Sequence, residues 1–204
     1  MAVKARQFYA TLSEVVRRAS KDESLPSICV VQFVVKNNVL FMIATDRFKV
    51  VVGRIEAEGL EDGTWLSRRG DVEALLGTMR AHKLGSAKSD KSLVELAPGD
   101  MWNIATQHGV ELTLRADWGG SFPKVQHFIP DDWEQGVTVD GAQIGADKNY
   151  LYSFDTGKDG RPQVFASKPD ADFDVVGVVM TVRNPEGERT WKRCASIREE
   201  LEGK

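Results

Sequence analysis

This sequence of 204 residues lacks long apolar runs and paired cysteines. No stretch approaches the roughly 18 consecutive apolar residues of a membrane-spanning helix. The first 20 residues contain no apolar core of the length that a secretory signal needs. We therefore expect a cytoplasmic protein with no membrane partner. Cys29 and Cys194 lie far apart and neither belongs to a CxxC pair, so the sequence does not support a zinc site or a redox motif.

Catalytic signatures are missing as well. The sequence contains no HExxH pair, no GxxxxGK[ST] phosphate loop, no GxGxxG turn and no GxSxG nucleophile elbow. We also find no constellation of a nucleophile with a base. We predict a protein that is not an enzyme and has no metal, no cofactor and no catalytic residue. The histidines without ligand spacing are His82, His108 and His127.

An excess of positive charge is also absent. The chain has 27 Lys and Arg residues against 30 Asp and Glu residues, which gives a formal net charge of −3. This balance argues against a protein that grips nucleic acid over its whole surface. A local basic face remains compatible with it.

What is present is a recurring order of predicted elements. Apolar residues at helical spacing predict a helix from Ala5 to Ser20, which Leu25-Pro26 ends and whose outer face is basic. A β-branched run at 28–35, a turn at Asn37-Asn38, and the runs VLFMIAT and FKVVVGRIEA predict about three strands.

The same order returns at a spacing of about 60 residues. Ser67 is predicted to cap a second apolar-faced helix, and SLVELAP, DMWNIATQ and VELTLRA follow as strands. A third, weaker copy begins with VTVDGAQIG, continues through the helix-like NYLYSF (149–154) and reaches the strands RPQVFAS and DFDVVGVVMTVRN. Two interpretations stay open, a repeated α/β module and an α+β domain with accidental regularity.

Three motifs, in this order, carry a resemblance to a known family. IATDRFKVVVGRI (43–55) resembles the ATDG hairpin in the second domain of bacterial sliding clamps. GGSFPKVQHFIP (119–130) resembles the FPDYxxxxP segment that closes that domain, and VVGVVMTVRN (175–184) is similar to the clamps' C-terminal strand. The chain thus resembles the bacterial DNA polymerase sliding clamp, the beta subunit of the replicative polymerase.

The resemblance implies an α+β sliding-clamp fold of repeated helix-plus-β-strand half-modules, with helices lining a lumen and antiparallel sheets outside. Residues 3–131 would form a clamp domain resembling the middle domain of bacterial clamps, with two half-modules. Residues 132–185 would form a half-module resembling the end of the last clamp domain. Residues 186–204 would be a charged tail that could form a helix.

The resemblance also implies a DNA-facing surface. In a clamp ring, basic side chains around the lumen contact the phosphates of double-stranded DNA without reading bases, so the protein can slide. The alternative is that these side chains are merely solvated helix faces. The candidates on or beside the predicted helices are Arg6, Arg17, Lys21, Arg68, Arg80 and Lys83.

In the family, the replicative DNA polymerase, the clamp loader and other replication proteins insert a short linear motif into an apolar cleft. Carried over to this chain, one wall of the cleft would be Thr45, Arg47, Phe48, Lys49 and Val50, with Pro130 as the floor. The other wall would be Val178, Val179, Met180, Thr181, Val182 and Arg183.

The chain departs from the family in sequence and in length. Arg47 and Phe48 stand where many clamps have Gly and His, and Thr181 replaces a frequent proline, so peptide preference is expected to differ. With about half the length of a bacterial clamp, the chain is expected to close a ring as a homo-oligomer, a tetramer or a trimer. We expect a virus-encoded clamp that acts in the cytoplasm of a bacterial host. The alternatives are a clamp-fold module that does not close and competes for or modifies host clamp interactions, and an unrelated α+β enzyme.

Overall fold

The computed structural model describes residues 2–47, 49–86, 92–107 and 109–125 in full. It also describes the backbone of four later strands, at 137–140, 151–155, 163–167 and 174–179.

Two copies of one unit, a strand followed by a helix and three strands, make up the first 115 residues. The first unit consists of β1 (Ala2–Lys4), α1 (Ala5–Val16), the short 3-10 helix η1 (Pro26–Ile28), β2 (Val30–Lys36), β3 (Val39–Thr45) and β4 (Lys49–Glu56). The second consists of β5 (Gly63–Arg68), α2 (Arg69–Ala81), β6 (Leu93–Ala97), β7 (Met101–Thr106) and β8 (Glu111–Arg115).

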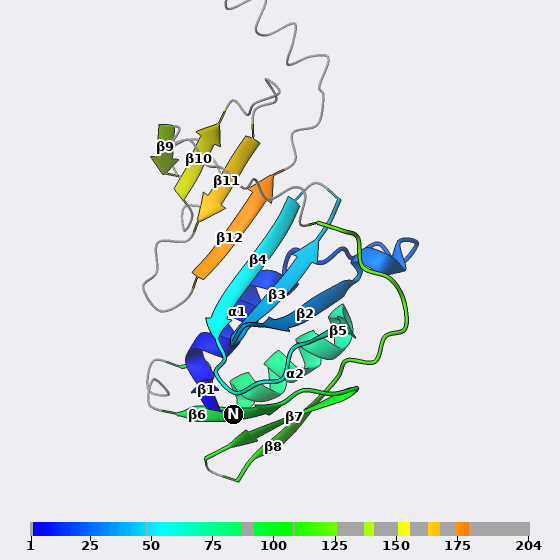
Figure 1. Ribbon diagram of the computed structural model, residues 1–204, viewed down its shortest axis with the longest axis vertical. Helices are drawn as coiled ribbons and strands as arrows, with labels where there is room; N and C mark the ends of the chain where they lie inside the picture. The colour runs from blue at the N-terminus through cyan, green and yellow to red at the C-terminus, as the bar shows by residue number, and fades with distance from the viewer. Residues whose placement is uncertain are drawn as a thin grey trace, which may run out of the picture.

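The two units exchange their first strands (Figure 1). β1 leaves its own unit and pairs with β6, with Val3 opposite Val94, in a four-stranded sheet of order β1-β6-β7-β8. β5 pairs in the same manner with β2 of the first unit, with Val31 opposite Ser67. Neither unit therefore completes its sheet alone, and the repeated-module interpretation of the sequence is confirmed for its first two copies.

A second group of strands continues the sheet beyond β4. β12 (Asp174–Val179) pairs antiparallel with β4 and is followed outward by β11 (Gln163–Ser167), β10 (Leu151–Asp155) and β9 (Val137–Asp140). The resulting eight-stranded sheet has the order β5-β2-β3-β4-β12-β11-β10-β9. The helix-like interpretation of 149–154 is wrong for the residues of β10, because the aromatic Tyr152 and Phe154 suit a strand that is paired on both sides.

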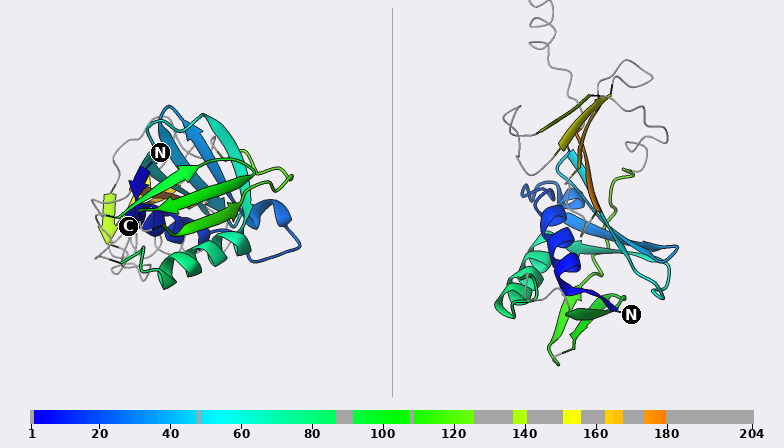
Figure 2. Two further views of the ribbon diagram at one scale, coloured as in Figure 1. Left: turned by 90° about the horizontal axis from the view of Figure 1, so that it is seen from below. Right: turned by 90° about the vertical axis from the view of Figure 1, so that its left-hand side faces the viewer.

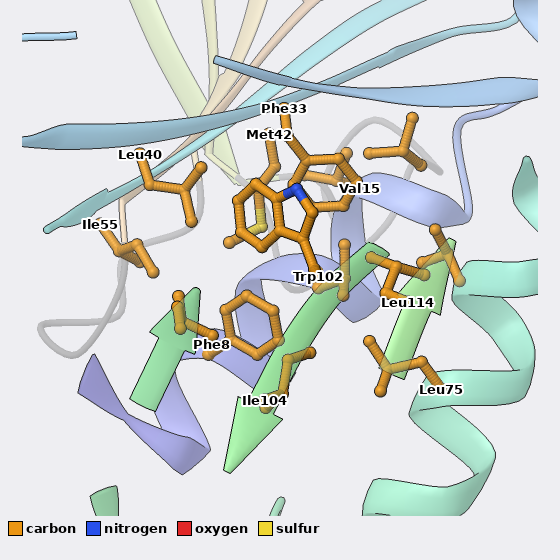
Figure 3. Packing of buried hydrophobic residues seen from close by; sticks show 14 of the residues in the cluster. Phe8, Val15, Phe33, Leu40, Met42, Ile55, Leu75, Trp102, Ile104 and Leu114 are labelled. Atoms are coloured by element: carbon orange, nitrogen blue, oxygen red, sulfur yellow. The ribbon is translucent and has the colours of Figure 1, made fainter. Parts of the chain in front are cut away.

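α1 and α2 lie side by side on one face of the molecule, with the strands behind them (Figure 2). The main core fills the space between these helices and the two sheets. Trp102 is fully buried at its centre, with ring centroids 5.1 Å from Phe33 and 5.4 Å from Trp65 (Figure 3). α1 approaches β4 so closely that a Cβ atom at Gly53 would collide with the Thr11 side chain. Helix position is thus fixed by packing against the sheet.

The predicted boundaries need three corrections. α1 ends at Val16, well before Pro26, because Arg18 and Ala19 close the chain into turns by donating to carbonyls three residues back. Ser67 does not cap α2; it lies inside β5, fully buried, and Arg68 occupies the cap position without a side-chain bond. β1 and β5 were not predicted as strands. The turn at Asn37-Asn38 is confirmed by positive φ angles of 52° and 62°.

Candidate functional site

The hairpin between β3 and β4 is closed by bonds between side chains and main chain. Thr45 pairs with Val50 at the last rung, and the Asp46 N–H donates to the Lys49 carbonyl at 3.2 Å. The Asp46 carboxylate accepts from the Lys49 N–H at 2.8 Å, and the buried Thr45 hydroxyl accepts from the Arg47 N–H at 3.3 Å. The charged residues between the two apolar runs therefore build a turn without glycine.

Arg47 occupies the position in this turn at which glycine would be least strained. Its φ angle is 80°, in the left-handed region that costs a non-glycine residue roughly 1–2 kcal/mol. Its side chain is exposed. Bonds from Ser24 lower the pKa of the Asp22 carboxyl below its usual value, and the charge of Arg47 lowers that pKa further. Arg47 thus lies near the connection between α1 and β2.

A second apolar cluster, the outer cluster, lies on the sheet face opposite the helices. Its buried members are Ile43, Val50 and Val125, and Phe122 packs against them. Ile43 alternates along β3 with Met42 and Ala44 of the main core, which places it on the other face. The FPKV part of the 119–130 motif therefore covers this face, and Val50 is 0% exposed. Val34, Phe41 and Val52 complete the outer cluster.

Two residues from each predicted wall of the cleft pair across the seam between β4 and β12. The backbone register places Val178 opposite Val50 and Val179 opposite Lys49. The end of β12 therefore lies beside the β3–β4 turn that carries Thr45 and Arg47. The remaining predicted cleft residues lie outside the residues that the structure describes: Phe48, Pro130, Met180, Thr181, Val182 and Arg183.

The predicted DNA-facing residues lie on or next to the paired helices. On α1, Arg6 is half-buried, and Arg17, directly after the helix, is exposed and forms an ion pair with Glu14 at 3.2 Å. On α2, the exposed Arg80 donates from Nε to the Tyr9 hydroxyl of α1 at 3.1 Å. The other three are also exposed: Lys21 after α1, Arg68 before α2 and Lys83 after α2.

No protein-family model matches the sequence, but solved structures match the fold. The DNA polymerase III beta chain of Streptococcus pneumoniae superposes with a TM-score of 0.62 at 12% identity, over 90% of this chain and 64% of that one. The beta subunit of Pseudomonas aeruginosa gives 0.65 at 12% identity, over 90% and 66%. The sliding clamp of Bacillus subtilis gives 0.63 at 10% identity, over 90% and 64%.

The chain has the sliding-clamp fold. This confirms the predicted fold class, with helices on one face and antiparallel sheets on the other. The chain spans just under two thirds of the length of the clamp chains that it matches.

The fully described ranges, 2–47, 49–86, 92–107 and 109–125, offer few groups that could form another kind of site. There, no group of three or more His, Cys, Asp or Glu side chains is arranged to hold a metal ion. Within the same ranges, none of the helices is long and apolar enough to cross a bilayer.

Two residues near these surfaces were missed by sequence reasoning. Arg69 ties α2 to the α1–β2 connection, because its guanidinium bonds Glu73 at 2.8 Å and also donates to the Ala19 carbonyl. Trp118 lines a cavity at the start of α2. The run Arg68-Arg69 was a signal for a basic spot, but no pattern in the sequence links Trp118 to it.

Proposed function

We propose that the protein is a DNA sliding clamp, a processivity factor that encircles double-stranded DNA and tethers polymerase to it. The observation that carries this proposal is the exchange of β1 and β5, which holds two helices side by side in front of continuous antiparallel sheets, in a fold matched by bacterial clamps. The structural neighbours are sliding clamps of DNA polymerase III, and the proposal extends their role to this chain.

The helix face suits a duplex that is held loosely. Arg80 and Lys83 are exposed cations at the end of α2, and Arg17 after α1 is exposed while paired with Glu14. Ala74 and Gly77 are exposed positions in the middle of α2. Because both residues are small, no bulky side chain projects from this part of the helix. Contacts between these cations and the DNA phosphates do not depend on base sequence. They would therefore stabilise bound DNA of any sequence and still allow the protein to slide along it.

The proposed cleft lies at the end of the β4–β12 seam. Val178 and Val179 share the last rungs of that seam with Val50 and Lys49. Val50 is also a buried member of the outer cluster, so this cluster adjoins the end of the seam. An apolar sheet end next to the charged turn at Arg47 suits a short linear motif with apolar anchors, such as those of a polymerase or a clamp loader.

The described strands leave four sheet edges, at β1 and β8 in one sheet and at β5 and β9 in the other, and the pair β8 and β9 supports ring closure. Within the described strands, β8 pairs only with β7 in its sheet and β9 pairs only with β10, and the two lie at opposite ends of the molecule in Figure 1. Unpaired edges favour pairing with another chain, and two different edges permit head-to-tail assembly that closes. The described strands of one chain form three groups of four, so a tetramer would bring twelve such groups into one ring. A tetramer of 22.6-kDa chains has a mass of about 90 kDa.

Topological trapping tests this proposal. The full chain, loaded onto nicked circular DNA, is expected to stay bound at high salt and to be released when the circle is linearised. Loss at high salt from circular and linear DNA alike would refute the ring. Sedimentation gives the number of chains, and a mass near 23 kDa at high concentration would also contradict closure.

The second candidate function is a clamp-fold module that does not close and competes for host clamp interactions. It is favoured by one observation, the coverage of only 64–66% of the matched clamp chains. Such a module binds clamp-binding peptides without being retained on circular DNA. Peptide binding together with failed trapping would therefore select this second candidate.

A further inference from the structure

A cavity of about 670 Å³ opens beside the start of α2. Three separate parts of the chain line it: the α1–β2 connection from Ser20 to Val30, residues 68–73 at the start of α2, and Trp118 after β8. Two of the predicted DNA-facing residues, Lys21 and Arg68, line this cavity, and none of the predicted cleft residues does.

The positively charged side chains that line the cavity differ in whether they form ion pairs and hydrogen bonds. Arg69 is occupied by Glu73 and by the Ala19 carbonyl, so this pair is neutral and fixed. Lys21 and Arg68 line the cavity as exposed side chains, and Arg68 lies at the cap position of α2, where the helix dipole also favours an anion.

Two further acids border the cavity. Asp71 lines this cavity and also a second one beside Arg115, where the pKa of Arg115 is raised mainly by Asp117 and further by Asp71. Glu23 is exposed on the α1–β2 connection and opposes an anion. Besides the Arg69–Glu73 pair, the lining therefore carries two cations, Lys21 and Arg68, and two acids, Glu23 and Asp71.

Trp118 provides a fixed aromatic surface. Its N–H donates to the Leu66 carbonyl at 3.1 Å, which attaches the residue to β5. The backbone of Gly120 packs against the ring, since a Cβ atom there would collide with it. The indole is half-buried and lines the cavity. Gly70 also lines the cavity, and a Cβ atom there would meet nothing within 4 Å.

The cavity and the β3–β4 turn lie at the same end of the sheet. Val30, the first residue of β2, pairs with Arg68 at the end of β5. β3 runs antiparallel to β2 and ends at this edge with Thr45, next to the start of β4. A polymerase bound at the proposed cleft would therefore adjoin the cavity.

We propose that this cavity holds an unpaired nucleotide of single-stranded DNA, with Trp118 stacked on the base and with Lys21 and Arg68 on the flanking phosphates. Aromatic stacking together with cations placed along the backbone is the general way in which proteins bind single strands without sequence preference. The biological meaning rests on the proposed function: a strand that leaves the duplex at the mouth of the ring would be guided past the cavity toward the polymerase.

The test is equilibrium binding of a labelled twelve-nucleotide oligothymidylate to the full chain, measured by fluorescence anisotropy at low salt. W118L is expected to weaken binding about tenfold, whereas W118F, which keeps an aromatic ring, retains most of the affinity. K21Q/R68Q is expected to weaken binding at least about tenfold, and E23Q to strengthen it. The charge-matched control K4Q/K36Q changes two exposed lysines that do not line the cavity, and it is expected to leave the affinity within about twofold.

A second readout locates the bound strand. Photocrosslinking of an oligonucleotide with bromodeoxyuridine in place of thymidine is expected to modify Trp118. Thermal melting confirms that each variant is folded before its affinity is interpreted. A folded W118L with wild-type affinity, or a K4Q/K36Q loss equal to that of K21Q/R68Q, would overturn the proposal. So would crosslinks confined to other residues, or equal effects of W118L on a duplex of the same length.

The two proposals fail separately. Binding of a short oligonucleotide requires no ring, so failed trapping on circular DNA leaves the cavity result intact. Successful trapping with no effect of Trp118 on single-strand binding refutes only the cavity. Competition for the cavity by a clamp-binding peptide instead of the oligonucleotide would identify a peptide site and likewise overturn the assignment to DNA.

Discussion

Replacing Gly53 with alanine tests whether the contact between α1 and β4 fixes the helix face. The added Cβ would collide with the Thr11 methyl group and lie 3.0 Å from Val15 Cγ2. Both of these side chains are 0% exposed, so neither can turn away into solvent. Overpacking of this kind costs about 1–3 kcal/mol. G53A is therefore expected to lower the free energy of unfolding by that amount, which corresponds to about 2–4 °C in Tm for each kcal/mol.

The T11S substitution removes the colliding methyl group and keeps the hydroxyl, which has no hydrogen-bond partner within the described residues. Alone, T11S is expected to cost about 1 kcal/mol because a buried methyl is lost. In G53A/T11S the new methyl fills the space of the old one, so the double variant should be more stable than the sum of the single effects by at least about 1 kcal/mol.

Urea unfolding of the full chain, followed by circular dichroism, measures all three variants. G77A is the matched control, because a Cβ at this exposed glycine of α2 meets nothing within 4 Å. It should stabilise the protein by about 0.5–1 kcal/mol. A harmless G53A, or strict additivity in the double variant, would refute the close approach of α1 to β4.

Three further predictions address the turn, an ion pair and the helix face. R47G is expected to be more stable than R47A by about 1 kcal/mol, because only glycine relieves the left-handed φ; equal melting temperatures would contradict it. The bond from Arg115 lowers the pKa of Asp117 below its usual 3.8, so the pair stabilises the fold above that pH and its contribution disappears as the pH falls through the lowered value. The stability difference between wild type and D117N should accordingly shrink on acidification below about pH 4, and a pH-independent difference in urea titrations would argue against the pair. R80Q is expected to reduce the slope of log K for duplex DNA against log salt concentration by about 1, and an unchanged slope would exclude a phosphate contact by Arg80.

Elements with a strong apolar period could be predicted from the sequence. Phe8, Leu12 and Val15 recur at helical spacing, and all three are buried. β1 and β5 could not be predicted in this way, because each becomes a strand only through a partner from the other unit. Ser67 looked like a helix cap because serine caps helices often, but its place inside β5 is set by pairing with Val31.

Only part of the candidate site could be predicted from the sequence. The ATD motif located a hairpin that the structure places beside β12, through the register of Val50 with Val178. The conformation of Arg47 carries no local signal, because arginine is an unusual choice for a positive φ. The burial of Val50 under Val125 joins residues that are far apart in sequence, and a period along one strand does not report such a contact.

The exchange of β1 and β5 also has consequences for the order in which the protein folds during synthesis. Val3 finds its partner in Val94, so the ribosome must add about 90 residues before the N-terminal strand can be paired. Until β6 has left the exit tunnel, α1 and β2–β4 have no complete core, and the apolar faces of Phe8 and Phe33 stay accessible to chaperones and to other nascent chains. A ribosome-bound chain truncated before β6 should therefore be sensitive to protease, and one extended past β8 should resist it. The strand arrangement that joins the two units thus also delays their folding until both have been made.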